Sequence, residues 1–501
     1  EISSLHARLL PASLIAAIFT LSLAGNMPVW EPFLIYALGT LWYGLFNWFW
    51  FWLWREQPLR ESLSLLYVQL AEYCEAKYTL LTQHTDPEKS LPPLLARQQK
   101  VVDLISQCYQ QLHMLAANKN HEYKRLLRTF QVGLDLQEHI SVSLHNPEEV
   151  QKLVERSHAE AVIRWNAQTV AARLRVLAED ILYHRYPTRF NMDKQLGALE
   201  KIARQHADNP VGQFAAWHFS RIARVLRTQR PLYTRDLMAD KQKRLPLLPA
   251  LKSYLSLKSS ALRNAARISV MLSIASLMGM ALHLPKPYWI LMTVLFVTQN
   301  GYGATRVRIL HRAGGTMAGL IIAGVTLHFH VPEGYTLVGM LAITMVSYLI
   351  IRKNYGWATV GFTVTAVYTL QLLTLNADQL IIARLVDTLI GCLIAFGGMV
   401  WLWPQWQSGL LRQNAHDALE ADQQAIRLIL SDDPQPSPLA YERMKVNQAH
   451  NALFNSLNQA MQEPGFNSHY LADMKLWVTH SQFIVEHINA MTTLAREHTM
   501  L

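Results

Sequence analysis

The chain has 501 residues, of which 51% are hydrophobic and 16% charged, and a formal net charge of +10. Its mean hydropathy is only +0.08, because long apolar runs and charged stretches average out along the chain. The basic residues stand at the ends of the apolar runs and in the polar stretches, which argues against a nucleic-acid partner. Three cysteines without a CxxC motif exclude a disulfide framework.

The first apolar runs cover about residues 9–25 and 30–54, and each is long enough to cross a bilayer. The second ends in a tryptophan-rich tract, which is typical of the membrane interface. When Thr40 is aligned with Thr388, the two runs resemble the last two of six later runs. We therefore expect residues 1–54 to be the last two helices of an N-terminally incomplete first membrane half. A coincidence between two tryptophan-rich helices is the alternative.

Residues 55–263 and 404–501 are rich in charges and have helical apolar periodicity, with prolines between the periodic stretches. Alternating β-branched strands are absent from both. The sequence therefore predicts a polar helical domain at 55–263 and a second, C-terminal polar helical region at 404–501.

Residues 264–403 contain six apolar runs and are expected to form a second membrane half of six helices. The runs cover about 264–284, 288–303, 312–329, 335–351, 357–374 and 380–403. The run at 288–303 is short and ends in polar residues, so we expect it to break before it crosses fully. Interrupted helices often frame transporter sites.

Basic residues alternate between the two sides of the predicted spans. One side carries clusters of arginine and lysine, at 55–60, 263–267, 306–312 and 352–353, whereas the opposite loops contain only Lys286. Cytoplasmic loops carry an excess of basic residues. Both polar helical regions are therefore expected to be cytoplasmic.

One pattern, R-x-x-x-T-x-x-G-x-x-I-A, occurs twice, beginning at Arg312 and at Arg384. On a helix its arginine, threonine, glycine and alanine share one face. Small residues allow close approach of helices in lipid, so Gly315, Gly319 and Gly391 are expected to serve helix packing. The predicted topology gives the two copies opposite directions across the membrane. The fold class expected is thus an all-α polytopic membrane protein with inverted three-helix repeats and cytoplasmic helical domains.

The segments W-R-E-Q-P-L-R-E-S-L at 54–63, P-Y-W-I-L-M-T-V-L-F-V-T-Q-N at 287–300, T-R-V-R-I-L-H-R-A-G-G-T-M-A-G at 305–319 and A-R-L-V-D-T-L-I-G-C-L-I-A-F at 383–396 carry a family resemblance. They resemble the fusaric acid resistance (FUSC) superfamily, and within it the YccS/YhfK family of inner-membrane proteins, most closely its YhfK branch. The resemblance implies a bacterial inner-membrane protein that self-associates as a homodimer. It also implies kinship with exporters and channels of organic anions.

Arg312 and Arg384 are candidates for binding an anionic substrate, because a guanidinium can bind a carboxylate through two parallel hydrogen bonds. For Arg312 the alternative is a positive-inside anchor. For Arg384 the alternative is a structural ion pair with Asp387 one helical turn away. Asp387 is also the candidate for proton coupling, as an acidic residue well inside a predicted span.

Other polar residues of the spans could line a pathway or merely bond between helices. They are Thr316, Thr388, Gln299, Tyr302, Tyr368 and Gln371. The segment G-Y-G-A-T at 301–305 matches neither phosphate-loop pattern. His328 and His330 lack a third ligand, so no metal site and no cofactor are expected.

The function expected is an inner-membrane transporter or exporter of small organic anions, aromatic ones included, with membrane lipids as its surroundings. Two alternatives stay open, an anion channel and a membrane scaffold or sensor that transports nothing. No catalytic constellation is found in the sequence, so an enzyme is not expected.

Overall fold

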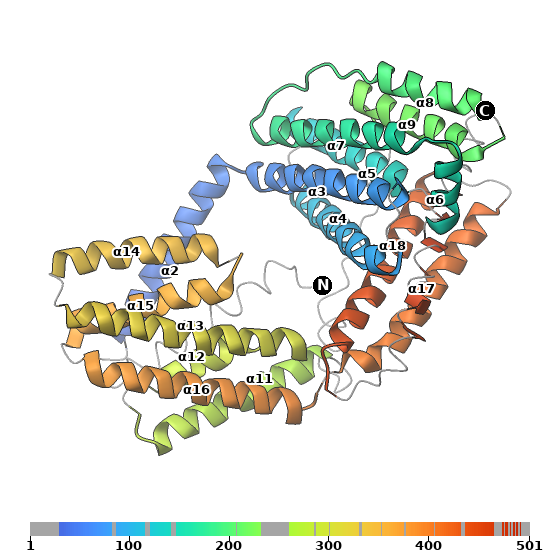
Figure 1. The fold of residues 1–501 in the computed structure, drawn as a ribbon. Helices are drawn as coiled ribbons and strands as arrows, with labels where there is room; N and C mark the ends of the chain where they lie inside the picture. Colours follow the sequence, from blue (N-terminus) through green and yellow to red (C-terminus); the bar gives the residue numbers. More distant parts are fainter. Residues whose placement is uncertain are drawn as a thin grey trace. The chain divides into compact units, whose positions relative to one another are not determined.

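The structure is a computed structural model of the chain. It describes residues 30–82, 87–115, 121–141, 147–206, 208–231, 260–284, 287–299, 301–329, 333–351, 353–374, 377–404, 406–431, 436–464 and scattered residues between 473 and 491. Every regular element in these ranges is an α-helix (Figure 1). The predicted all-α fold is confirmed, whereas the predicted span at 9–25 lies outside the described residues.

The chain divides into two compact units. Residues 1–46, 242–410 and 456–467 form one, called here the membrane unit, and residues 47–241, 411–455 and 468–501 form the other, called here the polar unit. Among the described residues, three helices are long and apolar enough to cross a bilayer, at Leu262–Ala281, Tyr302–His328 and Ile381–Trp401. All three belong to the membrane unit.

The helices of the membrane unit follow the predicted apolar runs. They are α11 (Ser260–Ala281), α12 (Tyr288–Val297), α13 (Tyr302–His328), α14 (Glu333–Ile350), α15 (Tyr355–Thr374) and α16 (Ala377–Trp401), with most of α2 (Trp30–Leu53) before them. As predicted, α12 is short. The start of α13 differs from the prediction, because the helix continues through the basic segment before Arg312, which a hydropathy count leaves out.

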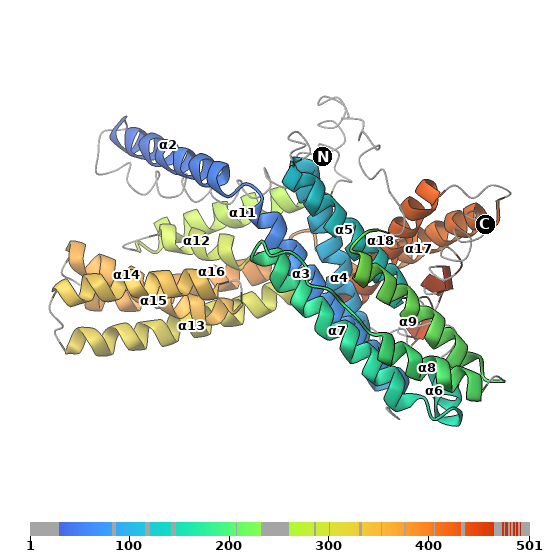
Figure 2. The same cartoon turned by 90° about the horizontal axis from the view of Figure 1, so that it is seen from above.

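The six helices α11 to α16 pack in two groups of three. In each group, the third helix is the one that the predicted repeats assign to the other group. Helix α16 packs with α11 and α12, whereas α13 packs with α15, and α15 with α14. Contacts of α13 and α15 with α16 join the two groups, and Figures 1 and 2 both show these helices side by side. The third helix of each predicted three-helix repeat therefore packs on the second helix of the other.

The polar unit is built around one large apolar core. Its helices are α3 (Gln57–Thr82), α4 (Pro87–Leu115), α5 (His121–Ser141), α6 (Pro147–Arg156), α7 (Glu160–Leu182), α8 (Asp193–Gln205), α9 (Pro210–Thr228), α17 (Gln407–Ile429) and most of α18 (Pro436–Ala460). Helix α3 packs on both α4 and α7, and its Leu63, Leu66 and Leu70 are fully buried. A buried ion pair of 2.7 Å between Arg443 Nη1 of α18 and Glu138 Oε1 of α5 ties the C-terminal helices to this unit.

Candidate anion site of the membrane unit

The repeated pattern lies on α13 and α16, two helices that pack against each other. In both copies the arginine, the threonine and the final alanine are buried, whereas Ile322 is 45% exposed. The spacing of the pattern places the first three on one helical face and the isoleucine beside it. The charged and small residues thus point into the protein, whereas Ile322 is exposed and Ile394 is half-buried.

The glycines of the first copy let α13 lie directly against α15. A Cβ atom added at Gly319 would stand 2.7 Å from the Val360 carbonyl oxygen and 2.8 Å from Thr363 Cβ. One added at Gly315 would stand 2.8 Å from the Gly356 carbonyl oxygen. Such distances leave no room for a side chain, so both glycines are required by backbone packing.

Gly391 in the second copy makes the corresponding contact between α16 and α12. A Cβ atom there would stand 2.7 Å from Thr293 Cβ and 3.1 Å from the Ile290 carbonyl oxygen. In both copies the glycine therefore faces a threonine of the neighbouring helix. It also faces the carbonyl group of the residue three positions before that threonine. This correspondence supports the inverted-repeat interpretation, which stays a prediction.

The two arginines are buried beside aromatic rings. The guanidinium carbon of Arg384 lies 4.4 Å from the centre of the Trp289 ring, and that of Arg312 lies 5.9 Å from the centre of the Phe296 ring. The charge of Arg384 is disfavoured by Arg312 and favoured by Asp387. Within the described residues, Nε of both arginines and Nη1 of Arg384 are buried without a hydrogen-bond partner. Buried, unsatisfied N–H groups of this kind are costly unless a ligand pairs with them.

Asp387 lies one turn after Arg384 and is fully buried. Neither carboxylate oxygen has a hydrogen-bond partner in the described part of the chain, and no ion pair within 4.0 Å joins it to Arg384 there. The two groups interact through their charges without direct contact, and the structural ion pair stays a prediction. Arg384 instead stacks on Trp289, which lies on α12.

Some of the remaining polar candidates form hydrogen bonds within or between helices, and others have no hydrogen-bond partner among the described residues. The Thr388 hydroxyl donates to the Arg384 carbonyl oxygen (2.8 Å), and Tyr368 Oη donates to Thr326 Oγ1 (2.5 Å), which joins α15 to α13. Thr316 Oγ1 and Gln371 Oε1 are buried without a partner among the described residues. Thr316 therefore keeps a free hydroxyl on the face that carries Arg312.

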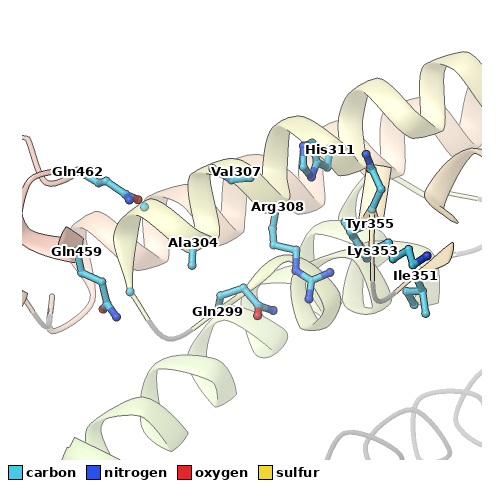
Figure 3. Close-up of a pocket in the computed structure, with 13 residues that line it drawn as sticks. Gln299, Ala304, Val307, Arg308, His311, Ile351, Lys353, Tyr355, Gln459 and Gln462 are labelled. Atoms are coloured by element: carbon cyan, nitrogen blue, oxygen red, sulfur yellow. The ribbon is translucent and has the colours of Figure 1, made fainter. Parts of the chain in front are cut away.

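A cavity of about 570 Å³ opens at the start of α13, shown in Figure 3. Its wall consists of Gln299, Gly301, Gly303, Ala304, Val307, Arg308, His311, Ile351, Lys353, Asn354, Tyr355, Gln459 and Gln462. Among the described residues, the wall thus holds three basic side chains and no carboxylate. Of the predicted site residues, Gln299 lies here, whereas Tyr302 faces Phe396 instead, with ring centres 6.2 Å apart.

Two helices begin at this cavity. Helix α13 follows Gly301, whose φ is +113°. No side chain caps the start of this helix. Helix α15 follows Asn354, whose Oδ1 accepts from the N–H of Gly356 at 3.0 Å. The Arg308 guanidinium lies 4.0 Å from the centre of the Tyr355 ring, which holds its donors in place.

Sequence reasoning missed most of this cavity. Arg308 was interpreted as part of a positive-inside cluster, and its spacing of four residues from Arg312 was the available signal for a shared face. Gln459 and Gln462 come from the end of α18 and the turn after it. No local pattern indicates that this distant segment meets the start of α13.

Helices that are long and apolar enough to span a bilayer, together with buried arginines on a repeated motif, define a polytopic α-helical membrane protein. Two family profiles match the chain: one described as FUSC-like inner membrane protein yccS over residues 1–237, and one described as fusaric acid resistance protein-like over residues 274–397. The chain belongs to this FUSC-like family of bacterial inner-membrane proteins. The membership indicates a role related to membrane transport.

Two relatives from Escherichia coli (strain K12) show the range of similarity. The uncharacterized protein YhfK is 83% identical over 501 residues, which are 100% of this chain and 72% of the relative. The inner membrane protein YccS is 33% identical over 204 residues, which are 40% of this chain and 28% of the relative. No solved structure matches the chain.

Proposed function

We propose that the protein carries small organic anions across the bacterial inner membrane, along a pathway that passes the buried arginine pair. The observation that carries this proposal is the state of Arg312 and Arg384: both are buried, and both keep N–H groups without a partner among the described residues. An anionic carboxylate would accept those hydrogen bonds and offset the repulsion between the two guanidinium groups. Family membership supports a transport-related role, and the substrate class is our inference.

The aromatic rings beside the arginines support anions with an apolar body. Arg384 over Trp289 and Arg312 over Phe296 each combine a cation with a ring face. A carboxylate would pair with the guanidinium, while an aromatic or aliphatic body would pack on the ring. This chemistry favours aromatic carboxylates over inorganic anions at the pair.

We assign proton coupling to Asp387. A buried carboxyl group without hydrogen-bond partners in the described residues can exchange a proton at modest structural cost, since no ion pair has to be broken. Coupling through this residue predicts an exporter driven by the proton gradient. A channel would instead pass anions down their electrochemical gradient without regard to Asp387.

The test is flux of benzoate and related aromatic acids in vesicles reconstituted with the full chain, with and without a proton gradient. Arg384→Gln and Arg312→Gln should lower flux by about 10-fold to 100-fold, the loss expected for charge-assisted hydrogen bonds. Arg306→Gln is the matched control, because Arg306 is exposed on the same helix. Flux in both arginine variants equal to that of the parent would refute the pathway past the arginines. No flux in the parent would refute transport and favour a scaffold.

The proposal includes an orientation with the polar unit in the cytoplasm, as the alternation of basic residues predicts. The exposed Arg230, just after α9, is a suitable labelling position as Arg230→Cys. The native cysteines should contribute little background, since burial raises the pKa of both Cys74 and Cys108 to about 12 and Cys392 is also buried. Labelling of intact cells by an impermeant thiol reagent would overturn this orientation.

We also propose that the chain works as a homodimer, as the family resemblance implies. Mass measurement in mild detergent and in lipid nanodiscs should give twice the chain mass of 57.2 kDa. A single-chain mass in both media would refute the dimer without affecting the transport proposal.

A further inference from the structure

The cavity at the start of α13 is positively charged and open to small molecules. Arg308, His311 and Lys353 line it, and none of the wall residues that the structure describes is acidic. Its volume of about 570 Å³ falls in the range of about 300–1,000 Å³ that small-molecule sites occupy. We propose that this cavity binds a compact, multiply charged oxyanion of the phosphate type, at a site separate from the buried arginine pair.

The donors of the cavity come from different directions, which suits a tetrahedral anion. Figure 3 shows Arg308 reaching from α13 between Lys353 on one side and the amide groups of Gln459 and Gln462 on the other. A planar carboxylate accepts mainly within its own plane, whereas the oxygens of a phosphate point to all sides. Two permanent cations, Arg308 and Lys353, also match the charge of a dianion.

The backbone adds a second contribution. Gly301 at φ +113° allows the chain to turn directly into α13, and the unblocked start of that helix supplies N–H groups and a partial positive charge. The segment 301–305 lacks the sequence patterns of nucleotide-binding loops. Those patterns describe loops after a strand, and the geometry of this all-helical unit reaches the same chemistry without one.

Two further features indicate a site prepared for a ligand. The Tyr355 hydroxyl oxygen is buried and has no hydrogen-bond partner in the described part of the chain, although its ring supports Arg308. Gln462 packs so closely on α13 that a Cβ atom at Gly303 would overlap its side-chain oxygen. Glu463 next to it accepts from the Gln407 and Ser408 N–H groups, at 2.5 and 3.2 Å, and so fixes the segment that carries the amides.

The experiment is calorimetric titration of the purified full chain with inorganic pyrophosphate in a neutral detergent, without any gradient. Arg308→Gln and Lys353→Gln should each weaken binding about tenfold, and the double variant about 100-fold. Arg306→Gln, the exposed control, and Arg384→Gln, at the buried pair, should bind as the parent does. Thermal unfolding of each variant checks that it is folded.

The outcomes separate this site from the proposed transport function. Binding that is lost in Arg384→Gln and kept in Arg308→Gln would overturn the cavity site, as would malonate binding as tightly as pyrophosphate. Pyrophosphate binding that persists when no variant transports anions would leave the cavity site standing while transport fails.

A second arm identifies the source of the phosphate. The titration is repeated in nanodiscs of phosphatidylcholine with and without phosphatidylglycerol. Weaker pyrophosphate binding with phosphatidylglycerol assigns the cavity to a lipid headgroup, and unchanged binding assigns it to a soluble phosphorylated anion. Absence of pyrophosphate binding in detergent and in both kinds of nanodisc would overturn the proposal.

Discussion

Several buried charges of the polar unit have an ion-pair partner, whereas three buried charges of the membrane unit have none among the described residues. In the polar unit, Arg443 pairs with Glu138, and His450 lies 2.9 Å from Asp422. In the membrane unit, Arg312, Arg384 and Asp387 are equally buried but form no ion pair with any residue that the structure describes. Breaking a buried ion pair destabilises the fold, because one charge is left buried without compensation. A buried charge without a partner already lowers the stability of the folded protein. The contrast teaches that the candidate functional groups of this protein are its buried charges without partners.

The largest expected effect is loss of the pair in the polar unit. Glu138→Gln should lower the free energy of unfolding by about 3–5 kcal/mol, because Arg443 would stay buried without its partner. The matched control is Glu75→Gln, which removes the exposed 2.6 Å pair with Arg175 and should cost about 0–1 kcal/mol. Thermal unfolding of both variants measures the difference, and equal midpoints would contradict it.

The next effect tests the packing that holds the membrane unit. Gly319→Ala should destabilise the protein by about 1–3 kcal/mol, since the new methyl group would overlap the Val360 carbonyl group. Gly314 is the control on the same helix, because a Cβ atom there meets nothing within 4 Å. Gly314→Ala should be neutral or slightly stabilising. If both alanine variants melt alike, the close approach of α13 and α15 is not required for stability.

One buried titratable residue of the polar unit, His218, is kept without charge. Burial, together with the nearby charges of His139 and Lys77, holds the pKa of His218 well below its usual value of 6.5, so the folded protein keeps this ring neutral. Below pH 6.5 the unfolded chain binds the proton and the folded chain does not. Stability should therefore fall as the pH decreases from about 6.5, by up to about 1.4 kcal/mol per pH unit.

His218→Phe should remove this slope, because the ring would still pack on Phe214, whose ring centre lies 5.4 Å away. The substitution His121→Gln, at an exposed position, should leave the slope unchanged. Unfolding midpoints measured between about pH 5 and 7 decide the matter. An unchanged slope in His218→Phe would assign the pH dependence to other groups.

The smallest expected effect is at Asp387, and its sign is the informative part. Asp387→Asn removes a buried charge that has no partner among the described residues, so stability should be unchanged or slightly higher. Anion flux in the variant should lose its dependence on the proton gradient. A loss of stability comparable to that of Glu138→Gln would mean that Asp387 is a structural residue like its counterpart in the polar unit.

The sequence predicted the helical class, the six later helices and the inward face of the repeated motif, because apolar runs and helical spacing are local properties. It did not predict that Arg384 would stack on Trp289, since that ring lies on a separate helix nearly a hundred residues earlier. The cavity was missed for the same reason: Gln459 and Gln462 share a cavity with Arg308 only through the tertiary fold. Sequence spacing therefore located the charged residues but could not give their contacts with other helices.

The exchange of third helices has a consequence for biosynthesis. When the ribosome has produced α11, α12 and α13, Gly315 and Gly319 of α13 still lack their partner helix α15, because α15 has not been made. Thr293 on α12 likewise cannot pack until Gly391 has been made, because Gly391 lies on α16, the last of these six helices. Neither group of helices can finish packing during its own insertion. A chain that ends after α14 should thus be inserted but incomplete, and a substrate for membrane proteases.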